Sequence, residues 1–274
     1  MTEVGSAPRP TLSGEERAAL ADDIRILIRL HDKEPDVALI ESLRNTDPSE
    51  WFSLSVDGEA FTEGARLFKE SLAELETPPS ERDLDLLAAE FAGIYLNYDY
   101  QAAPTESVWR DEENLERQAA MFMARDWYAR YGLQVPNWRI RSDDHLVNEL
   151  HFVSVLLDLE NKPDSLSDAA TFLRDHLLVW IPEFAKRVTL RCEMAFYAAS
   201  VLVTYAYLQK VGALLGEATG VDMTLPDLVL RPVGSNPPDM PDCGSPRGDK
   251  SEQRPRRPGH VLFESNPDGR QSRV

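Results

Sequence analysis

The sequence predicts an all-α fold, a single bundle of about eight helices followed by a disordered C-terminal tail. Helix-start signals stand directly before apolar stripes with helical spacing, as at Ser13 and Glu16, which match a capping box. No segment shows the strict apolar–polar alternation of a half-buried strand. Glycine is scarce, at 14 of 274 residues, which disfavours turn-rich β folds and glycine-rich phosphate loops. These three observations favour helices throughout.

Each expected helix is bounded by residues that start or stop helices. Pro35 suits the first turn of the second helix, Ser80 with Asp83 caps the fourth, and Gly132 ends the fifth. Pro182 is expected to begin the last and longest helix. The expected helices cover residues 13–28, 35–43, 61–75, 80–96, 112–131, 143–159, 167–180 and 182–215. Short connections between most of them predict one bundle.

The chain divides by composition into three parts. Residues 1–12 are expected to be a flexible N-terminus, and residues 13–231 an all-helical domain with ample length for a core. Residues 232–274 hold eight prolines and almost no apolar run, so that segment is predicted to be a disordered tail rich in proline and arginine. Its basic cluster, residues 254–257, is interpreted either as solvated or as a docking site for the acidic body.

Compartment signals favour the cytoplasm. Residues 1–10 lack a basic start followed by an apolar stretch, so no secretory signal is expected. Cys192 and Cys243 are the only cysteines, and their contexts do not suggest a disulfide. Residues 194–209 carry no charge, but this run is shorter than the ~20 residues of a spanning helix. We therefore expect a buried core helix and no stable membrane insertion.

The charge balance limits the possible partners. The formal net charge is -18, which repels nucleic-acid phosphates, so no nucleic acid is expected as a partner. Such a surface attracts cationic partners, for example a peptide with adjacent arginines. The alternative interpretation is that acidity only keeps the protein soluble.

No motif for an enzyme is present. The sequence lacks a P-loop, a dinucleotide-binding glycine motif, a nucleophile elbow and cysteine pairs with metal spacing. His145 and Glu149 share a helix face, but such a pair suits a structural hydrogen bond better than a metal site. We therefore expect no catalytic activity, no cofactor and no metal. A helical metal- or nucleotide-dependent enzyme stays the less favoured hypothesis.

Aromatic residues gather between the fourth and fifth expected helices. Phe91 and Tyr95 end a helix, and Tyr98, Tyr100 and Trp109 follow in an expected loop over residues 97–110. Phe91 and Tyr95 also suit a core role. Aromatic side chains beside a few polar groups form good pockets for an apolar peptide helix.

Three sequence blocks lie in order over about residues 85–200. The blocks are Glu90-Phe91 through Tyr95 to Pro104-Thr105-Glu106-Ser107-Val108-Trp109, then Asp144-His145-Leu146 with Glu149-Leu150 and Phe152, then Phe172-Leu173, His176-Leu177, Trp180, Pro182 and Phe184. Together they resemble the TorD/DmsD family of molybdoenzyme maturation chaperones. The family's Gly-Pro after the aromatic helix end is Asn97-Tyr98 here, and its Glu-Pro before Asp-His is Arg141-Ser142. We expect Asn97 to supply the left-handed backbone of that turn.

The resemblance implies a cytoplasmic chaperone that binds the twin-arginine signal peptide of a molybdopterin-dependent oxidoreductase and assists cofactor insertion before export. The implied peptide-binding residues are Phe91, Ile94, Tyr95, Tyr98, Pro104, Trp109, Asp144 and His145. Asp144 and His145 also suit a purely structural role at a helix N-terminus. The alternative is an assembly chaperone that binds the body of a nitrate-reductase-like catalytic subunit. A monomer and a dimer both stay open.

Overall fold

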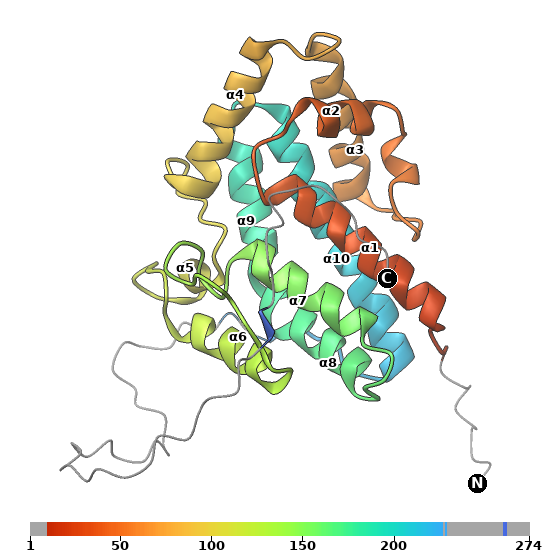
Figure 1. Cartoon of the computed structure of the whole chain (residues 1–274). Helices are drawn as coiled ribbons and strands as arrows, with labels where there is room; N and C mark the ends of the chain where they lie inside the picture. Colours follow the sequence, from red (N-terminus) through yellow and green to blue (C-terminus); the bar gives the residue numbers. More distant parts are fainter. Residues whose placement is uncertain (1–9, 227, 229–259, 262–274) are drawn as a thin grey trace, which may run out of the picture.

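A computed structural model describes residues 10–226, 228, 260 and 261 (Figure 1). It confirms the all-α class. The helices are α1 Gly14–His31, α2 Val37–Arg44, α3 Glu59–Glu74, α4 Glu81–Phe91, α5 Glu106–Arg110, α6 Ala119–Arg130, α7 Leu146–Asp158, α8 Ser165–Phe172, α9 Leu178–Arg191 and α10 Ala195–Thr219. A 3₁₀ turn covers Pro48–Glu50, and π-helical turns cover Ala92–Leu96 and Leu173–Leu177. Strand β1 (Leu133–Gln134) pairs in parallel with β2 (His260–Val261).

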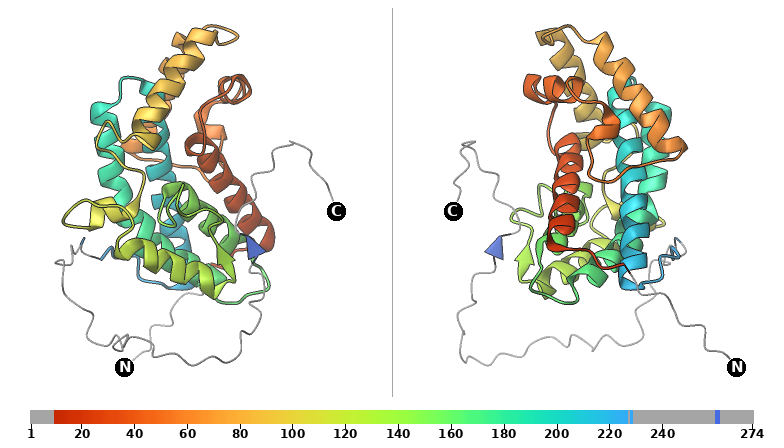
Figure 2. Two further views of the ribbon diagram at one scale, coloured as in Figure 1. Left: turned by 60° about the vertical axis from the view of Figure 1, so that its left-hand side comes forward. Right: turned by 90° about the vertical axis from the view of Figure 1, so that its right-hand side faces the viewer.

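Helix α10 forms the centre of the bundle. It packs along α3 and α9 and also contacts α8, while α1 packs along α7 (Figure 2). Within the described residues, α10 is long and apolar enough to cross a membrane. However, 67% of its most apolar 18-residue stretch is buried inside the protein. Phe196, Tyr197 and Tyr207 on this helix are fully buried in the core. The apolar character of α10 is that of a core helix.

Helices α3 and α10 approach each other closely at Gly64. A β-carbon at Gly64 would lie 2.9 Å from Val203 Cγ2 and 3.2 Å from the Val203 backbone nitrogen. Only a residue without a side chain lets the two helix backbones approach this closely. The glycine therefore fixes how α3 packs on the central helix.

The predicted capping box at the start of α1 and the predicted cap at the start of α4 are confirmed. The Ser13 hydroxyl accepts a hydrogen bond from the Glu16 amide, and the Glu16 carboxylate accepts one from the Ser13 amide. Ser80 and Asp83 make the same reciprocal pair. Each pair satisfies two backbone donors that the first helical turn leaves free.

Several predicted helix bounds were wrong. Pro182 lies inside α9, and the predicted final helix breaks instead between Arg191 and Ala195. The Glu90 carboxylate stabilises this break, because it accepts hydrogen bonds from the amides of Glu193 (2.6 Å) and Met194 (3.4 Å). Glu90 comes from α4, a hundred residues away in sequence, so local signals could not reveal it.

The segment between α4 and α6 also differs from the prediction. The expected loop over residues 97–110 contains helix α5, and the expected helix over residues 112–131 begins only at Ala119. Asn114 and Arg117 adopt positive φ angles of 53° and 62°, which a helix does not allow. Apart from β2, the predicted disordered tail over residues 232–274 lies outside the described residues, as does most of the predicted flexible N-terminus.

Candidate functional site around helix α5

Strained backbone brackets helix α5 on both sides. Tyr98 and Gln101 precede it with φ angles of 57° and 52°, and Asn114 and Arg117 follow it. In the part of the chain that the structure describes, every residue with positive φ other than glycine lies in this segment. The left-handed residue of the turn is Tyr98, not Asn97 as predicted, and Asn97 has a φ of -103°. Such conformations cost on the order of 1–3 kcal/mol each, so other contacts must hold the segment.

Asp144 supplies the first of these contacts. Its buried carboxylate accepts a hydrogen bond from the Ser107 amide (2.8 Å) and from the hydroxyls of Ser107 and Ser142. Burial raises the pKa of the Asp144 carboxyl, although the hydrogen bonds from Ser107 and Ser142 oppose that shift. The Asp144 carbonyl also accepts from the Glu106 amide (2.9 Å). Asp144 thus ties the start of α5 to the segment before α7.

His145 occupies the N-terminal cap of α7. Its Nδ1 accepts a hydrogen bond from the Val147 amide (3.2 Å), and the adjacent Leu146 amide donates to the Pro104 carbonyl (2.8 Å). Burial lowers the pKa of His145 well below its ordinary value, and the nearby charge of Arg141 acts in the same direction. The imidazole is therefore neutral near pH 7. These contacts show His145 in the structural role at a helix N-terminus that the sequence analysis kept as an alternative to peptide binding.

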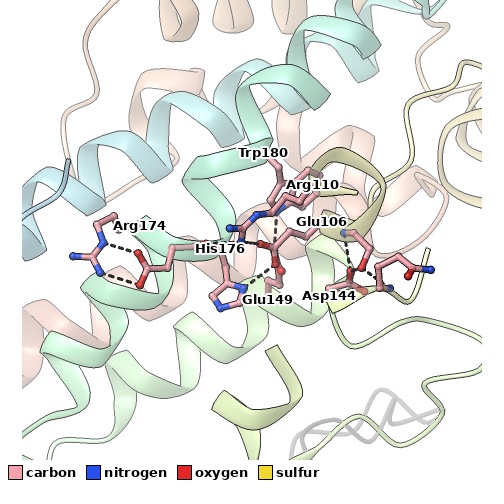
Figure 3. A network of polar contacts seen from close by, with 10 residues as sticks. Glu106, Arg110, Asp144, Glu149, Arg174, His176 and Trp180 are labelled. Carbon is pink, nitrogen blue, oxygen red and sulfur yellow. Dashed lines mark hydrogen bonds and ion pairs between the residues drawn. The ribbon is translucent and has the colours of Figure 1, made fainter. Parts of the chain in front are cut away.

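A buried polar cluster holds the other side of α5 (Figure 3). Glu106 contacts His176 Nδ1 through Oε2 (2.7 Å) and accepts from Arg110 Nη1 through Oε1 (2.5 Å). Trp180 Nε1 donates to Glu149 Oε2 (3.2 Å). Glu106, Glu149 and His176 are fully buried, so their mutual contacts replace those with water.

The pKa values of the two carboxyl groups in the cluster are shifted in opposite directions. Burial alone would raise the pKa of Glu106, but His176 and Arg110 outweigh it and lower that pKa. Burial and the charge of Glu106 together raise the pKa of Glu149 well above its ordinary value. Glu106 is therefore ionised and Glu149 protonated near neutral pH. The guanidinium of Arg110 therefore pairs with the carboxylate of Glu106, and Glu149 adds no second negative charge.

The same cluster has the ligand types of a metal centre. One atom each from Glu106, Glu149 and His176 lies within 4.8 Å of the others. Glu149 Oε1 and His176 Nε2 are buried without a hydrogen-bond partner among the described residues. However, Arg110 already supplies the cation that Glu106 needs, and Glu149 would have to lose its proton. The geometry suits a proton-sharing structural cluster better than a cation site.

The predicted aromatic residues are packed inside the protein. Phe91 stacks on Tyr95 (4.6 Å between ring centroids), and the Tyr95 hydroxyl contacts His31 Nδ1 (2.6 Å). Trp109 donates from Nε1 to the Ala103 carbonyl (2.8 Å) and meets Phe184 edge-on. Ile94 and Pro104 are also buried, whereas Tyr98 is half-buried.

The predicted residues therefore form two groups rather than one open aromatic groove. Trp109 lies on α5, with Pro104, Asp144 and His145 beside that helix, while Phe91 ends α4 and Ile94 and Tyr95 belong to the π-helical turn that follows. The predicted loop over residues 97–110 was wrong in that it contains α5, and of its aromatic residues Trp109 is buried whereas Tyr98 and Tyr100 are half-buried. The anchors Glu106, Ser107, Arg110 and His176 were not predicted as site residues. All except Arg110 belong to the sequence blocks that resemble the family.

The fold and the site thus define a helical protein whose buried polar groups anchor a strained segment. Residues 58–186, which include this site, match the family described as nitrate reductase delta subunit. The chaperone protein TorD of Photobacterium profundum is 30% identical over 165 residues, covering 57% of this chain and 75% of the relative. TorD of Shewanella loihica is 28% identical over 200 residues, covering 70% and 90%. TorD of Vibrio cholerae is 30% identical over 132 residues, covering 45% of this chain and 60% of the relative.

The chain belongs to the TorD/DmsD family, and the relatives it matches are named chaperones rather than enzymes. It spans less than two thirds of the length of the Vibrio cholerae relative.

Proposed function

We propose that this chain is a cytoplasmic chaperone that binds the twin-arginine signal peptide of a molybdopterin-dependent oxidoreductase and assists cofactor insertion before export. Membership in the TorD/DmsD family is the observation that carries the proposal. The packing of α10 as a core helix is consistent with a protein that works in solution.

The proposed peptide site is the region between α5 and the start of α7. The strained residues around α5 store free energy that favours movement of the segment. Movement of α5 away from α7 would uncover Pro104, Trp109 and the Asp144–His145 pair for the apolar part of a peptide helix. Phe91, Ile94 and Tyr95 would form a deeper apolar floor. Tyr98 is already partly exposed at the edge.

The charges of the segment suit a doubly positive peptide end. Asp99, Glu112 and Glu113 are exposed on the two strained flanks of α5. Their carboxylates can accept charge-assisted hydrogen bonds from arginines. In this proposal α5 first moves away from α7, and the peptide then contacts the uncovered residues. Because the first step costs free energy, it lowers the apparent affinity for the peptide.

Calorimetry with a synthetic signal peptide tests the site. We expect replacement of both Asp144 and His145 by alanine to weaken binding at least ~tenfold, because contact groups are lost. Ser107→Ala removes one bond to Asp144 but leaves the carboxylate, so it should ease opening and tighten binding about threefold. Ser53→Ala is the matched control, because Ser53 donates to buried Asp23 far from α5 in sequence and should leave affinity unchanged.

Three results would contradict this site. The dissociation constant could stay unchanged in the double variant, Ser107→Ala could weaken binding, or a peptide with both arginines replaced by glutamine could bind equally well. Urea denaturation of each variant separates lost binding from lost folding, since Asp144 and His145 are buried.

A second candidate is an assembly chaperone that binds the body of a nitrate-reductase-like catalytic subunit. The match to the nitrate reductase delta subunit family favours this alternative. Co-purification with a client lacking its signal peptide discriminates the two. Undiminished binding to the truncated client would support the alternative, and loss of binding would support recognition of the signal peptide.

A further inference from the structure

Residues 115–141 form a positively charged island on an acidic chain. They contain five arginines and two acidic residues, a net charge of +3 where the whole chain carries -18. The segment runs from the strained loop after α5 through α6 to the residues before α7. An acidic protein that concentrates arginines in one place creates a local field of the opposite sign.

The arginines of this island gather around one indole ring. The guanidinium carbons of Arg117, Arg125 and Arg139 lie 6.0, 5.2 and 5.1 Å from the centroid of Trp138. Arg117 Nη2 also donates to the Arg139 carbonyl (3.0 Å), which joins the two loops. Arg125 pairs with Asp143, but no ion pair links Arg117 or Arg139 to a carboxylate of the described residues.

Large apolar side chains of the same segment face solvent. Four of the large apolar residues exposed in the described structure belong to this segment: Leu115 (47%), Phe122 (52%), Met123 (42%) and Ile140 (83%). The Arg125 guanidinium lies 5.5 Å from the Phe122 ring and so bridges α6 to Trp138. We call this surface, made by Arg117, Phe122, Trp138, Arg139 and Ile140, the Trp138 patch. Helix α6, which carries Phe122, lies at the edge of the bundle (Figure 1).

We infer that the Trp138 patch binds a protein segment that carries carboxylates beside apolar side chains. Arginine is the residue best suited to carboxylate recognition, and exposed aromatic and aliphatic residues mark contact surfaces. The two guanidiniums without carboxylate partners supply the charge complement, and Ile140 and Phe122 supply the apolar contact. This surface has the opposite charge to the one required by twin arginines, so the inference does not depend on the proposed function.

The test uses the full chain and three labelled helical peptides that share a leucine face. Their polar faces carry glutamate, glutamine or lysine, and binding is followed by fluorescence anisotropy. We expect the glutamate peptide to bind at least ~tenfold more tightly than the lysine peptide. Arg117→Gln combined with Arg139→Gln should weaken that binding about tenfold. The control variant, Arg82→Gln combined with Lys186→Gln, removes the same amount of charge from exposed positions elsewhere. It should leave the affinity for the glutamate peptide unchanged.

A second pair of variants tests the apolar part without touching the loops' hydrogen bond. Ile140→Ser should weaken binding of the glutamate peptide about fivefold, whereas Leu190→Ser, at a similarly exposed leucine on α9, should leave it unchanged. Equal affinity for the glutamate and lysine peptides would overturn the inference. So would binding to phosphatidylglycerol vesicles without binding to the glutamate peptide, which would assign the patch to a membrane surface.

Discussion

Replacing Glu106 by alanine will lower the free energy of unfolding by about 3–5 kcal/mol, measured by urea denaturation at pH 7. The carboxylate of Glu106 binds both Arg110 and His176 inside the protein. Its removal leaves a largely buried guanidinium and a fully buried imidazole without their partner. Unpaired buried charges and polar groups are among the few causes of such large effects.

Two further variants separate the loss of charge from the loss of volume. Glu106→Gln keeps the shape and should cost less than alanine, because the amide oxygen still accepts from Arg110. Glu63→Ala breaks an exposed ion pair with Arg66 and should cost far less than Glu106→Ala, because solvent screens that pair. A loss below about 1 kcal/mol for Glu106→Ala would contradict the anchoring role of the cluster.

The cluster links stability to the proposed peptide site, because Glu106 is the first residue of α5. Asp144 holds the same turn from the other side through Ser107. The strained flanks favour movement of α5, and these two anchors oppose it. A balance of this kind allows a buried site to open without unfolding of the whole domain.

Local sequence signals predicted the parts of the fold that depend on neighbouring residues. Capping at Ser13 and Ser80 follows from residues three positions apart, and the core role of α10 follows from its uncharged length. The break before α10 depends on Glu90, which reaches it from another helix. Pro182 misled the prediction because a proline can be tolerated inside a helix when packing holds the surrounding residues.

The sequence identified several residues of the candidate site but did not predict how they are arranged. The Asp144–His145 pair was found through the family resemblance, but its burial under α5 depends on backbone angles at residues such as Tyr98 and Gln101. Neither residue is a usual choice for positive φ, so no turn signal indicated them. The Glu106–His176 contact joins residues 70 positions apart and has no local signature.

Buried neutral histidines will make the protein unstable in mild acid. His31 lies between the Tyr95 hydroxyl and the Thr204 hydroxyl (2.8 Å), and burial lowers its pKa to about 3. Burial likewise lowers the pKa of His145 well below its ordinary value. In the unfolded chain both histidines take up a proton near pH 6.5. Below that pH the unfolded state therefore binds more protons, and stability falls by up to about 1.4 kcal/mol per pH unit for each histidine.

Glu149 acts in the opposite direction over part of the same range. Its pKa is raised in the folded protein, so the folded state holds a proton that the unfolded state has lost above about pH 4.5. Its contribution to stability is complete below that pH and declines as pH rises toward the folded pKa. Asp144, whose pKa is also raised, adds a contribution of the same sign. Burial also lowers the pKa of His151 to about 4, so three histidines oppose Glu149 and Asp144 between about pH 4.5 and 6.5, and we expect net destabilisation on acidification.

Urea denaturation at several pH values between 4.5 and 6.5 gives the free energy of unfolding as a function of pH. The contribution of each buried group is the change in the slope of that dependence when the group is replaced. Glu149→Gln removes the opposing group, so the loss of stability on acidification should steepen by about 1.4 kcal/mol per pH unit. His31→Gln removes one of the histidines and should make that loss shallower by about the same amount. The fully exposed Asp57 titrates below this range in both states, so Asp57→Asn should leave the slope unchanged. If the Glu149 and His31 variants both kept the slope of the unmodified chain, the buried groups would not carry the protonation states that their surroundings impose.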